Sequence, residues 1–320
     1  MTSRPTAYRE NYSAQKPSSS FWIEKFNQEQ RQKFVEQWYL CQEILARGGR
    51  SGKDVERNAK TRAKSLLNQI KERPELDAIA GNALLLNMMV RYHRDKLGED
   101  LPQRKVELYQ GICELQLDRR PSLRKIELLL NSTNQRQEVL QFVALEMMKL
   151  ASEYQDDGFK QIQRYDLLKN LKTGLDRFNN EVNVEQFLAQ MVDISEMLVR
   201  RDEDIYQFSH LNFQEFLAAS ELVRLKEEGE ALLFEKLNLN AWKDTILFYA
   251  SLTPNPNRLV QRLVDLDNRD LVDFIYRQAN KADVLKSLEK LVIDKISAIN
   301  SLKNISRRRN GKKLTKKLIN

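Results

Sequence analysis

The strongest constraint on the fold comes from residues 183–221, which begin with a helical pattern. Asn183 can act as an N-cap for a helix whose third residue is Gln186. The apolar side chains then recur at helical spacing and predict one buried face, made of Val184, Phe187, Leu188, Met191 and Val192. We therefore expect a short amphipathic helix directly after Asn183.

Two short apolar segments follow this helix. Residues 197–200 and 205–208 flank the polar turn 201–204, with the sequence Arg-Asp-Glu-Asp, which is the signal of a β-hairpin. A second helical pattern starts at Asn212. A helix, a short hairpin and another helix in this order predict a winged helix.

The rest of the chain has the composition of amphipathic helices. Of its 320 residues, 31% are charged, but only 10 are glycine and 7 are proline, which suits helices with solvated outer faces better than a strand-rich sandwich. Helical patterns extend over residues 55–120, 139–151 and 226–300. The expected fold class is mainly α, with a helical bundle domain, a winged-helix domain that contains a small β-hairpin, and a C-terminal helical region.

The net charge of +8 belongs to the end of the chain. Residues 303–320 contain eight basic residues and no acidic one, and the other 45 basic residues equal the 45 acidic ones, so residues 1–302 are formally neutral. We expect this tail to bind polyanions, nucleic acid included, through counterion release and without sequence preference. The residues assigned to this binding are Arg307, Arg308, Arg309, Lys312, Lys313, Lys316 and Lys317.

Self-sufficient catalysis is not indicated by any motif. Only two histidines are present, His93 and His210, and the sequence has no metal-spaced Cys/His cluster and no nucleophile motif. The glycine-rich loop at 48–53 resembles a phosphate-binding loop, but Arg47 and Asp54 replace the first Gly and the final Ser or Thr of that motif. We predict that the chain is not an enzyme and that it holds no metal or cofactor by itself.

The location suggested by the sequence is the cytoplasm. Cys41 and Cys113 lie far apart, which does not indicate a disulfide framework. The longest apolar run, 84–90, is too short to span a membrane, and the N-terminus lacks the apolar core of a secretory signal.

The winged helix raises the question of DNA binding. A recognition helix presents Arg, Lys, Asn or Gln to the base edges, whereas the candidate helix carries Glu185, Asp193 and Glu196, with no Lys or Arg between Asn180 and Val199. Packing against another domain is the preferred interpretation of this helix.

Residues 208–219, with the sequence FSHLNFQEFLAA, resemble the winged-helix signature of NACHT-type signalling ATPases, the STAND class that includes the NOD-like receptors. The resemblance implies that His210 contacts the terminal phosphate of bound ADP and holds a closed, inactive state. The alternative, which the residues alone favour, is a histidine that only caps the helix from Asn212.

Two further segments resemble the same family in the same order. Residues 76–109 are similar to the helical domain that follows the NACHT core, although Ala83 stands where the family usually has the Pro that packs near the adenine. Arg4 and Pro5 resemble the end of the sensor strand, where the family's Arg reads the ATP γ-phosphate. By this resemblance the chain begins inside a nucleotide-binding domain, and the Walker A and Walker B segments are not in the sequence.

The resemblance implies a regulatory fragment with five parts: a remnant of the nucleotide-binding core at 1–28, a helical domain at 29–107, a winged-helix domain at 108–225, a C-terminal helical region at 226–302 and the basic tail at 303–320. Its expected partners are an upstream P-loop segment or further copies of itself, and ADP or ATP with Mg²⁺ would bind only when that core is supplied. The alternatives are a nucleic-acid-associated helical protein that uses the winged helix and the tail, and an inert product of a truncated gene.

Overall fold

The computed structural model describes residues 24–96, 100–119, 127–151, 160–178, 181–268, 271–272, 275 and 289. The chain divides into two compact units, residues 1–104 and 105–320, each of which is described by itself. Arg4, Pro5 and the basic tail lie outside the described residues. The expectations that rest on them therefore stay predictions.

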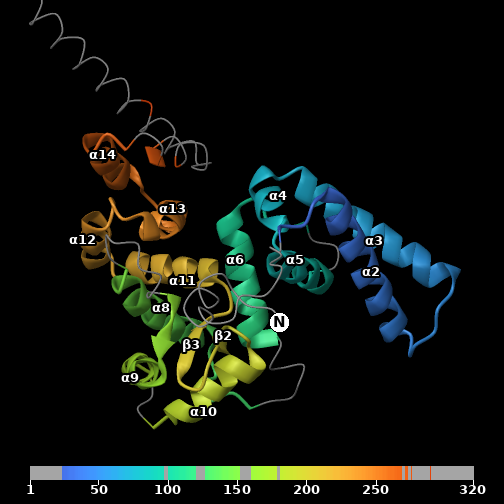
Figure 1. Ribbon diagram of the computed structural model, residues 1–320, viewed down its shortest axis with the longest axis horizontal. Coiled ribbons are helices and arrows are strands. Elements are labelled where there is room, and N and C mark those ends of the chain that lie inside the picture. Colours follow the sequence, from blue (N-terminus) through green and yellow to red (C-terminus); the bar gives the residue numbers. More distant parts are fainter. Residues whose placement is uncertain are drawn as a thin grey trace, which may run out of the picture. The chain divides into compact units, whose positions relative to one another are not determined.

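Among its described residues, the first unit contains the helices α2 (Gln28–Ala46), α3 (Lys53–Lys71), α4 (Pro74–Ala80) and α5 (Ala83–Asp95). Figure 1 shows α2 and α3 as a long helical hairpin. A capping box starts α2, because Asn27 and Gln30 each accept the other's backbone N–H through a side-chain oxygen. The glycine-rich loop joins two helices, and Gly48 and Gly49 have positive φ angles of 65° and 86°, so it is a turn between helices without the strand that a phosphate-binding loop requires.

His93, one of the two histidines, belongs to the core of this first unit. Its Nδ1 atom lies 2.6 Å from the hydroxyl of Tyr39, and both side chains are buried. Burial is the main cause that lowers the pKa of His93 and raises the pKa of Tyr39. This pair is a packing contact between α2 and α5.

The second unit contains the predicted winged helix. Its helices and strands, in order, are α6 (Lys105–Glu114), which continues as a π-helical turn (Leu115–Arg119), α8 (Thr133–Lys149), β1 (Ile162–Gln163), α9 (Arg164–Leu175), α10 (Val184–Ala189), a second π-helical turn (Gln190–Ile194), β2 (Leu198–Arg200), β3 (Ile205–Phe208) and α11 (Leu211–Arg224). The strands form one antiparallel sheet in the order β1-β3-β2, with Ile162 opposite Tyr206 and Leu198 opposite Phe208. The mainly α fold class, the winged helix and its hairpin are confirmed.

Strand β1 and the start of α8 differ from what the sequence predicts. β1 is only two residues long, and it is a strand because its backbone pairs with β3. Helix α8 begins at Thr133, six residues before the first residue of the predicted segment. Its first turn contains the fully buried Arg136, which donates to the carbonyls of Leu117 and Leu130, and this long-range contact is not visible in an apolar periodicity.

Further helices follow α11 in the second unit. The elements whose bounds the described residues give are α12 (Glu227–Glu235), a 3-10 turn (Asn240–Trp242), α13 (Lys243–Leu252) and α14 (Asn257–Asp265). Figure 1 shows α8 and α13 beside α11, and both pack on it. The core of the unit is therefore built around α11, whose residues 213–219 are all buried.

Candidate functional site

The first candidate residue, His210, is the N-cap of α11 at the point where β3 ends. Its backbone is extended, with φ −145° and ψ 142°, and its Nδ1 atom accepts the backbone N–H of Asn212 at 3.1 Å. The capping role that the residues alone favoured is therefore present in the fold.

This cap determines which ring nitrogen carries the proton. A neutral imidazole has one N–H donor and one acceptor nitrogen, so a ring whose Nδ1 accepts a hydrogen bond has its proton on Nε2. His210 is half-buried. The chain thus fixes the ring against the start of α11 as an Nε2–H donor, which is the form that could donate to a phosphate oxygen.

A buried polar and aromatic cluster follows directly on the same helix. The Asn212 side chain donates to the carboxylate of Glu215 at 2.7 Å. The ring of Tyr109 from α6 lies 5.2 Å from the ring of Phe213 and 5.2 Å from that of Phe248 on α13. Contacts of this kind are worth about 0.5–1.5 kcal/mol each beyond area burial, so the cluster ties α6 and α13 to the helix that His210 caps.

Glu215 has the most unusual electrostatic environment in this cluster. Burial, followed by the negative charge of Asp244, raises its pKa to about 8, although the Asn212 hydrogen bond and the charges of Lys105 and Lys160 act in the opposite direction. At neutral pH the Glu215 carboxyl is therefore mostly protonated. Chemical use of this proton would need access to a substrate, and the side chain is only 4% exposed.

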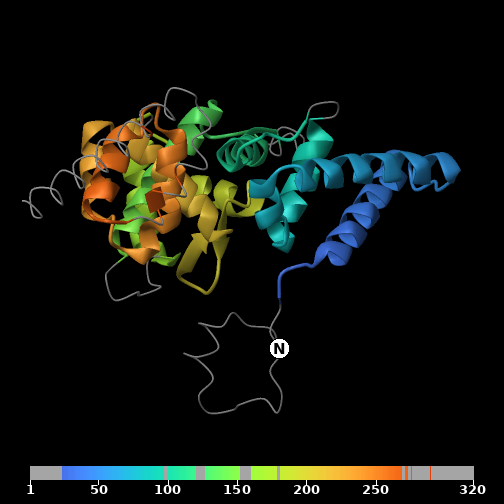
Figure 2. The same cartoon turned by 90° about the horizontal axis from the view of Figure 1, so that it is seen from above.

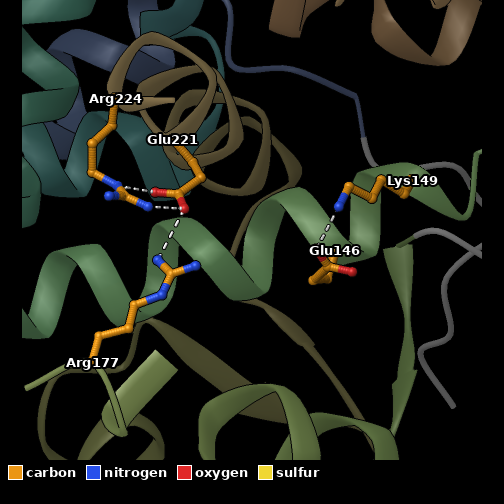
Figure 3. Close-up of polar contacts among 5 residues, drawn as sticks. All are labelled: Glu146, Lys149, Arg177, Glu221 and Arg224. Atoms are coloured by element: carbon orange, nitrogen blue, oxygen red, sulfur yellow. Dashed lines mark hydrogen bonds and ion pairs between the residues drawn. The ribbon is translucent and has the colours of Figure 1, made fainter. Parts of the chain in front are cut away.

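The C-terminal half of α11 contains a buried ion pair. Glu221 is fully buried and accepts from Arg177, just after α9, at 3.1 Å and from Arg224 at 2.6 and 2.7 Å (Figure 3). The Arg177 guanidinium also lies 4.4 Å from the ring centre of Phe142 on α8. Removing one partner of such a pair leaves an uncompensated buried charge, so Glu221 holds α8, α9 and α11 in one arrangement.

The exposed pair in Figure 3 has a different role. Lys149 and Glu146 are one turn apart on α8, 2.6 Å from each other and partly accessible to water. Solvent screens a pair of this kind, and it contributes about 0–1 kcal/mol. It belongs to the solvated outer face of α8.

The candidate recognition helix, α10, starts as predicted. Asn183 caps it and accepts from the N–H of Gln186 at 3.0 Å. Of the predicted buried face, Phe187 and Leu188 of α10 and Met191 of the following π-helical turn are buried, whereas Val184 and Val192 are half-buried. The exposed Glu185 is paired with Arg164 at the start of α9, at 2.5 Å. The helix therefore presents an acidic residue held by a neighbouring arginine, which does not favour DNA reading.

The second candidate residue, Ala83, is in the first unit. It is the exposed first residue of α5, directly after the N-cap Asn82, whose side chain accepts from the N–H groups of Leu84 and Leu85. Of the three leucines after it, Leu85 and Leu86 are buried and Leu84 is half-buried. An adenine contact at Ala83 stays a prediction.

Neither a metal-binding cluster nor a membrane-spanning helix is found among the described residues. They contain no group of three or more His, Cys, Asp or Glu side chains that could hold a metal ion. In the same part of the chain, no helix combines the length and the apolar character that crossing a membrane requires.

Comparison with known proteins places the second unit in context. Residues 105–222 match the family model described as the winged helix-turn-helix domain C-terminal to NACHT. The match starts at the first residue of α6 and ends two residues before the last residue of α11. It therefore includes His210, Glu215 and Glu221. A search of curated proteins found no match.

Proposed function

We propose that this chain, whose residues 105–222 are a winged helix-turn-helix domain of the type found C-terminal to NACHT, is a regulatory module of a NACHT-type signalling ATPase. In this proposal it couples the nucleotide state of a P-loop core to conformational switching and oligomerisation in the cytoplasm. ADP or ATP with Mg²⁺ binds when that core is present, and the chain does not catalyse hydrolysis alone.

The observation that carries the proposal is the geometry of His210 within the matched domain. Its Nδ1 atom is engaged by the N–H of Asn212, which leaves the proton on Nε2. A hydrogen bond from Nε2–H to the β-phosphate of ADP would involve a charged partner and be worth about 1.5–3 kcal/mol. If that bond forms only in the closed state, it biases the closed-to-open equilibrium by roughly tenfold or more.

The nucleic-acid alternative is not favoured in the described part of the chain. The acidic Glu185 on α10 is paired with Arg164, and the run of basic residues in the sequence that could carry such binding is the tail at 303–320. The tail remains a proposed site for nonspecific polyanion binding.

The test uses two variants at His210 in the full chain, co-expressed with an upstream segment that contains the Walker loop. His210→Ala removes both the cap and the ring donor. His210→Asn keeps a good N-cap residue but cannot place a donor where the imidazole Nε2 lies. We expect both variants to release ADP about tenfold faster than the wild type and to oligomerise more readily, with only the Ala variant losing about 1 kcal/mol of stability.

The readouts are the dissociation rate of a fluorescent ADP and the melting temperature of the same samples. Arg4→Ala is measured beside them and should impair the response to ATP while ADP retention stays close to that of the wild type. If His210→Asn restores both the melting temperature and the ADP dissociation rate of the wild type, His210 is only a cap and the sensing role is wrong.

A further inference from the structure

A groove lies between α2 and α3 in the first unit, where no function has been assigned. The two helices are joined by the turn at 47–52 and spread apart from there (Figure 2, the two blue helices). At their open end they line a cavity of about 460 Å³, with Leu86 of α5 and Ile70 of α3 among its buried walls. This volume is in the range of small-molecule sites.

One wall of the groove is basic. Lys60, Lys64 and Lys71 all line it, and their spacing of four and seven residues puts the three on one face of α3. Among the described residues, none of these three lysines lies within ion-pairing distance of a carboxylate. Their ammonium groups are exposed and available to a ligand.

The opposite wall carries too little negative charge to balance these three lysines. Gln28, Gln32 and Glu36 line it from α2, and the Glu36 carboxylate accepts from the Gln32 amide at 2.8 Å. The Arg31 guanidinium is already used, because it donates to the carboxylate of Asp77 at 2.6 Å and to the carbonyl of that residue at 3.2 Å. Arg31 and Asp77 both line the groove and neutralise each other, so three ammonium groups remain against the Glu36 carboxylate and the groove has an unbalanced positive charge.

We propose that this groove is a binding site for a small anion that carries at least two phosphate groups. Lys60 and Lys64 are one helical turn apart, so both can contact neighbouring phosphates, and Lys71 reaches a more distant anionic group. The limited volume of the groove favours a small molecule over a nucleic acid backbone. A long polyanion laid along the groove would also run past the Glu36 carboxylate. Residues 1–23 do not complement this charge, since they contain three basic residues and one acidic residue.

The site is independent of His210. All its lining residues belong to α2, α3, α4 and α5, and the winged-helix domain contributes none of them. The groove could therefore bind its ligand even if the proposed switching role of His210 is wrong. Likewise, the switching role does not depend on the groove.

The experiment is a calorimetric titration of the full chain with inorganic tripolyphosphate at near-physiological salt, where the basic tail contributes a background common to all variants. Lys60→Gln/Lys64→Gln is compared with Lys33→Gln/Lys53→Gln, which removes the same charge from α2 and α3 at exposed positions outside the groove. We expect one equivalent to bind to the wild type and the groove variant to bind it about tenfold or more weakly, as for two lost charge-assisted hydrogen bonds. The control variant should stay within about twofold of the wild type.

Three results would overturn the proposal. The first is an equal loss in both double variants, which would mean that only net charge matters. The second is the absence of a saturable one-equivalent phase in the wild type. The third is that citrate, or a short DNA duplex, binds as tightly as tripolyphosphate and loses as much affinity in Lys60→Gln/Lys64→Gln. The site would then not select a small phosphate compound.

Discussion

At the residue scale, Glu215 is the group in the matched domain whose environment departs furthest from that of a solvated carboxyl. Charged and titratable side chains surround it from several elements: Lys105 and Tyr109 come from α6, Asp244 comes from α13, and Lys160 precedes β1. Tyr109 is also affected, because burial and then the charge of Glu215 raise its pKa well above the ordinary value. Ionising Glu215 therefore disturbs the contacts that join α6 and α13 to α11.

The pH dependence of stability follows from this pKa. The folded chain keeps the Glu215 proton up to a pH of about 8, whereas the unfolded chain loses it near 4.5. The folded state thus binds more protons between these values, and the contribution of Glu215 to stability falls as the pH rises, by at most about 1.4 kcal/mol per pH unit. Below pH 4.5 this loss of stability is absent, and above pH 8 it is complete.

Glu215→Gln removes that titration and keeps an acceptor for Asn212. We expect the free energy of unfolding of the variant, relative to that of the wild type, to rise steadily between pH 5 and pH 8. Urea unfolding of the two proteins at pH 5.0, 6.5 and 8.0 measures this difference, in which the contributions of all other groups cancel. Parallel pH curves for the two proteins would contradict the assignment.

At the element scale, helices α11 and α12 are in close backbone contact at Gly229. Of the glycines within described helices, Gly229 leaves the least room for a Cβ atom. A Cβ atom at Gly229 would lie 2.0 Å from the carbonyl oxygen of Leu222, a contact that only movement of one helix could relieve. The turn between the two helices is also constrained, because Lys226, the N-cap of α12, has a positive φ of 53°. The glycine at 229 is thus a packing requirement of the pair α11–α12.

Gly229→Ala should therefore destabilise the chain by about 1–3 kcal/mol, the usual cost of overpacking, even though alanine has the higher helix propensity. Gly174→Ala is the matched control in another helix, since its Cβ would meet a side-chain methyl of Val139 at 3.2 Å, and a methyl can shift. Its loss should be clearly smaller. Denaturant unfolding of the wild type and both variants measures the two losses of stability. A Gly229→Ala chain as stable as the wild type would show that α12 moves away from α11 at little cost.

At the scale of the whole molecule, the two units carry different parts of the proposed machinery. The winged-helix unit holds His210, while the first unit holds Ala83 and the lysine-lined groove. The Walker A and Walker B motifs, which provide most of the phosphate and Mg²⁺ contacts in P-loop ATPases, are not in the sequence.

The chain by itself should therefore show no ATPase activity and no tight binding of ADP outside the lysine-lined groove. Isothermal titration with ADP and Mg²⁺ is the measurement, and Lys60→Gln/Lys64→Gln serves as the control that separates the groove from any other site. Micromolar or tighter ADP binding that survives this double substitution would contradict the prediction, because it would require a nucleotide site that includes neither the groove nor a Walker loop.

The sequence by itself determined the local order of the winged helix. The cap at Asn183, the apolar stripe of α10, the polar turn at 201–204 and the start of α11 all depend on neighbouring residues, so they can be read from spacing. The signature at 208–219 led to the same NACHT-associated domain that the family model matches.

Only the tertiary structure decided the features that depend on residues far apart in the sequence. Strand β1 is a strand because it pairs with β3, and Arg136 is buried because distant carbonyls accept its hydrogen bonds. Glu215 keeps its proton because the fold buries it and brings Asp244 of α13 near it. The groove lysines look like an ordinary solvated helix face in the sequence, and they become a candidate site because α2 lies opposite them. The physical reason is the same in each case: hydrogen bonding, desolvation and concavity depend on what the folded chain brings near a residue, and local periodicity does not encode these neighbours.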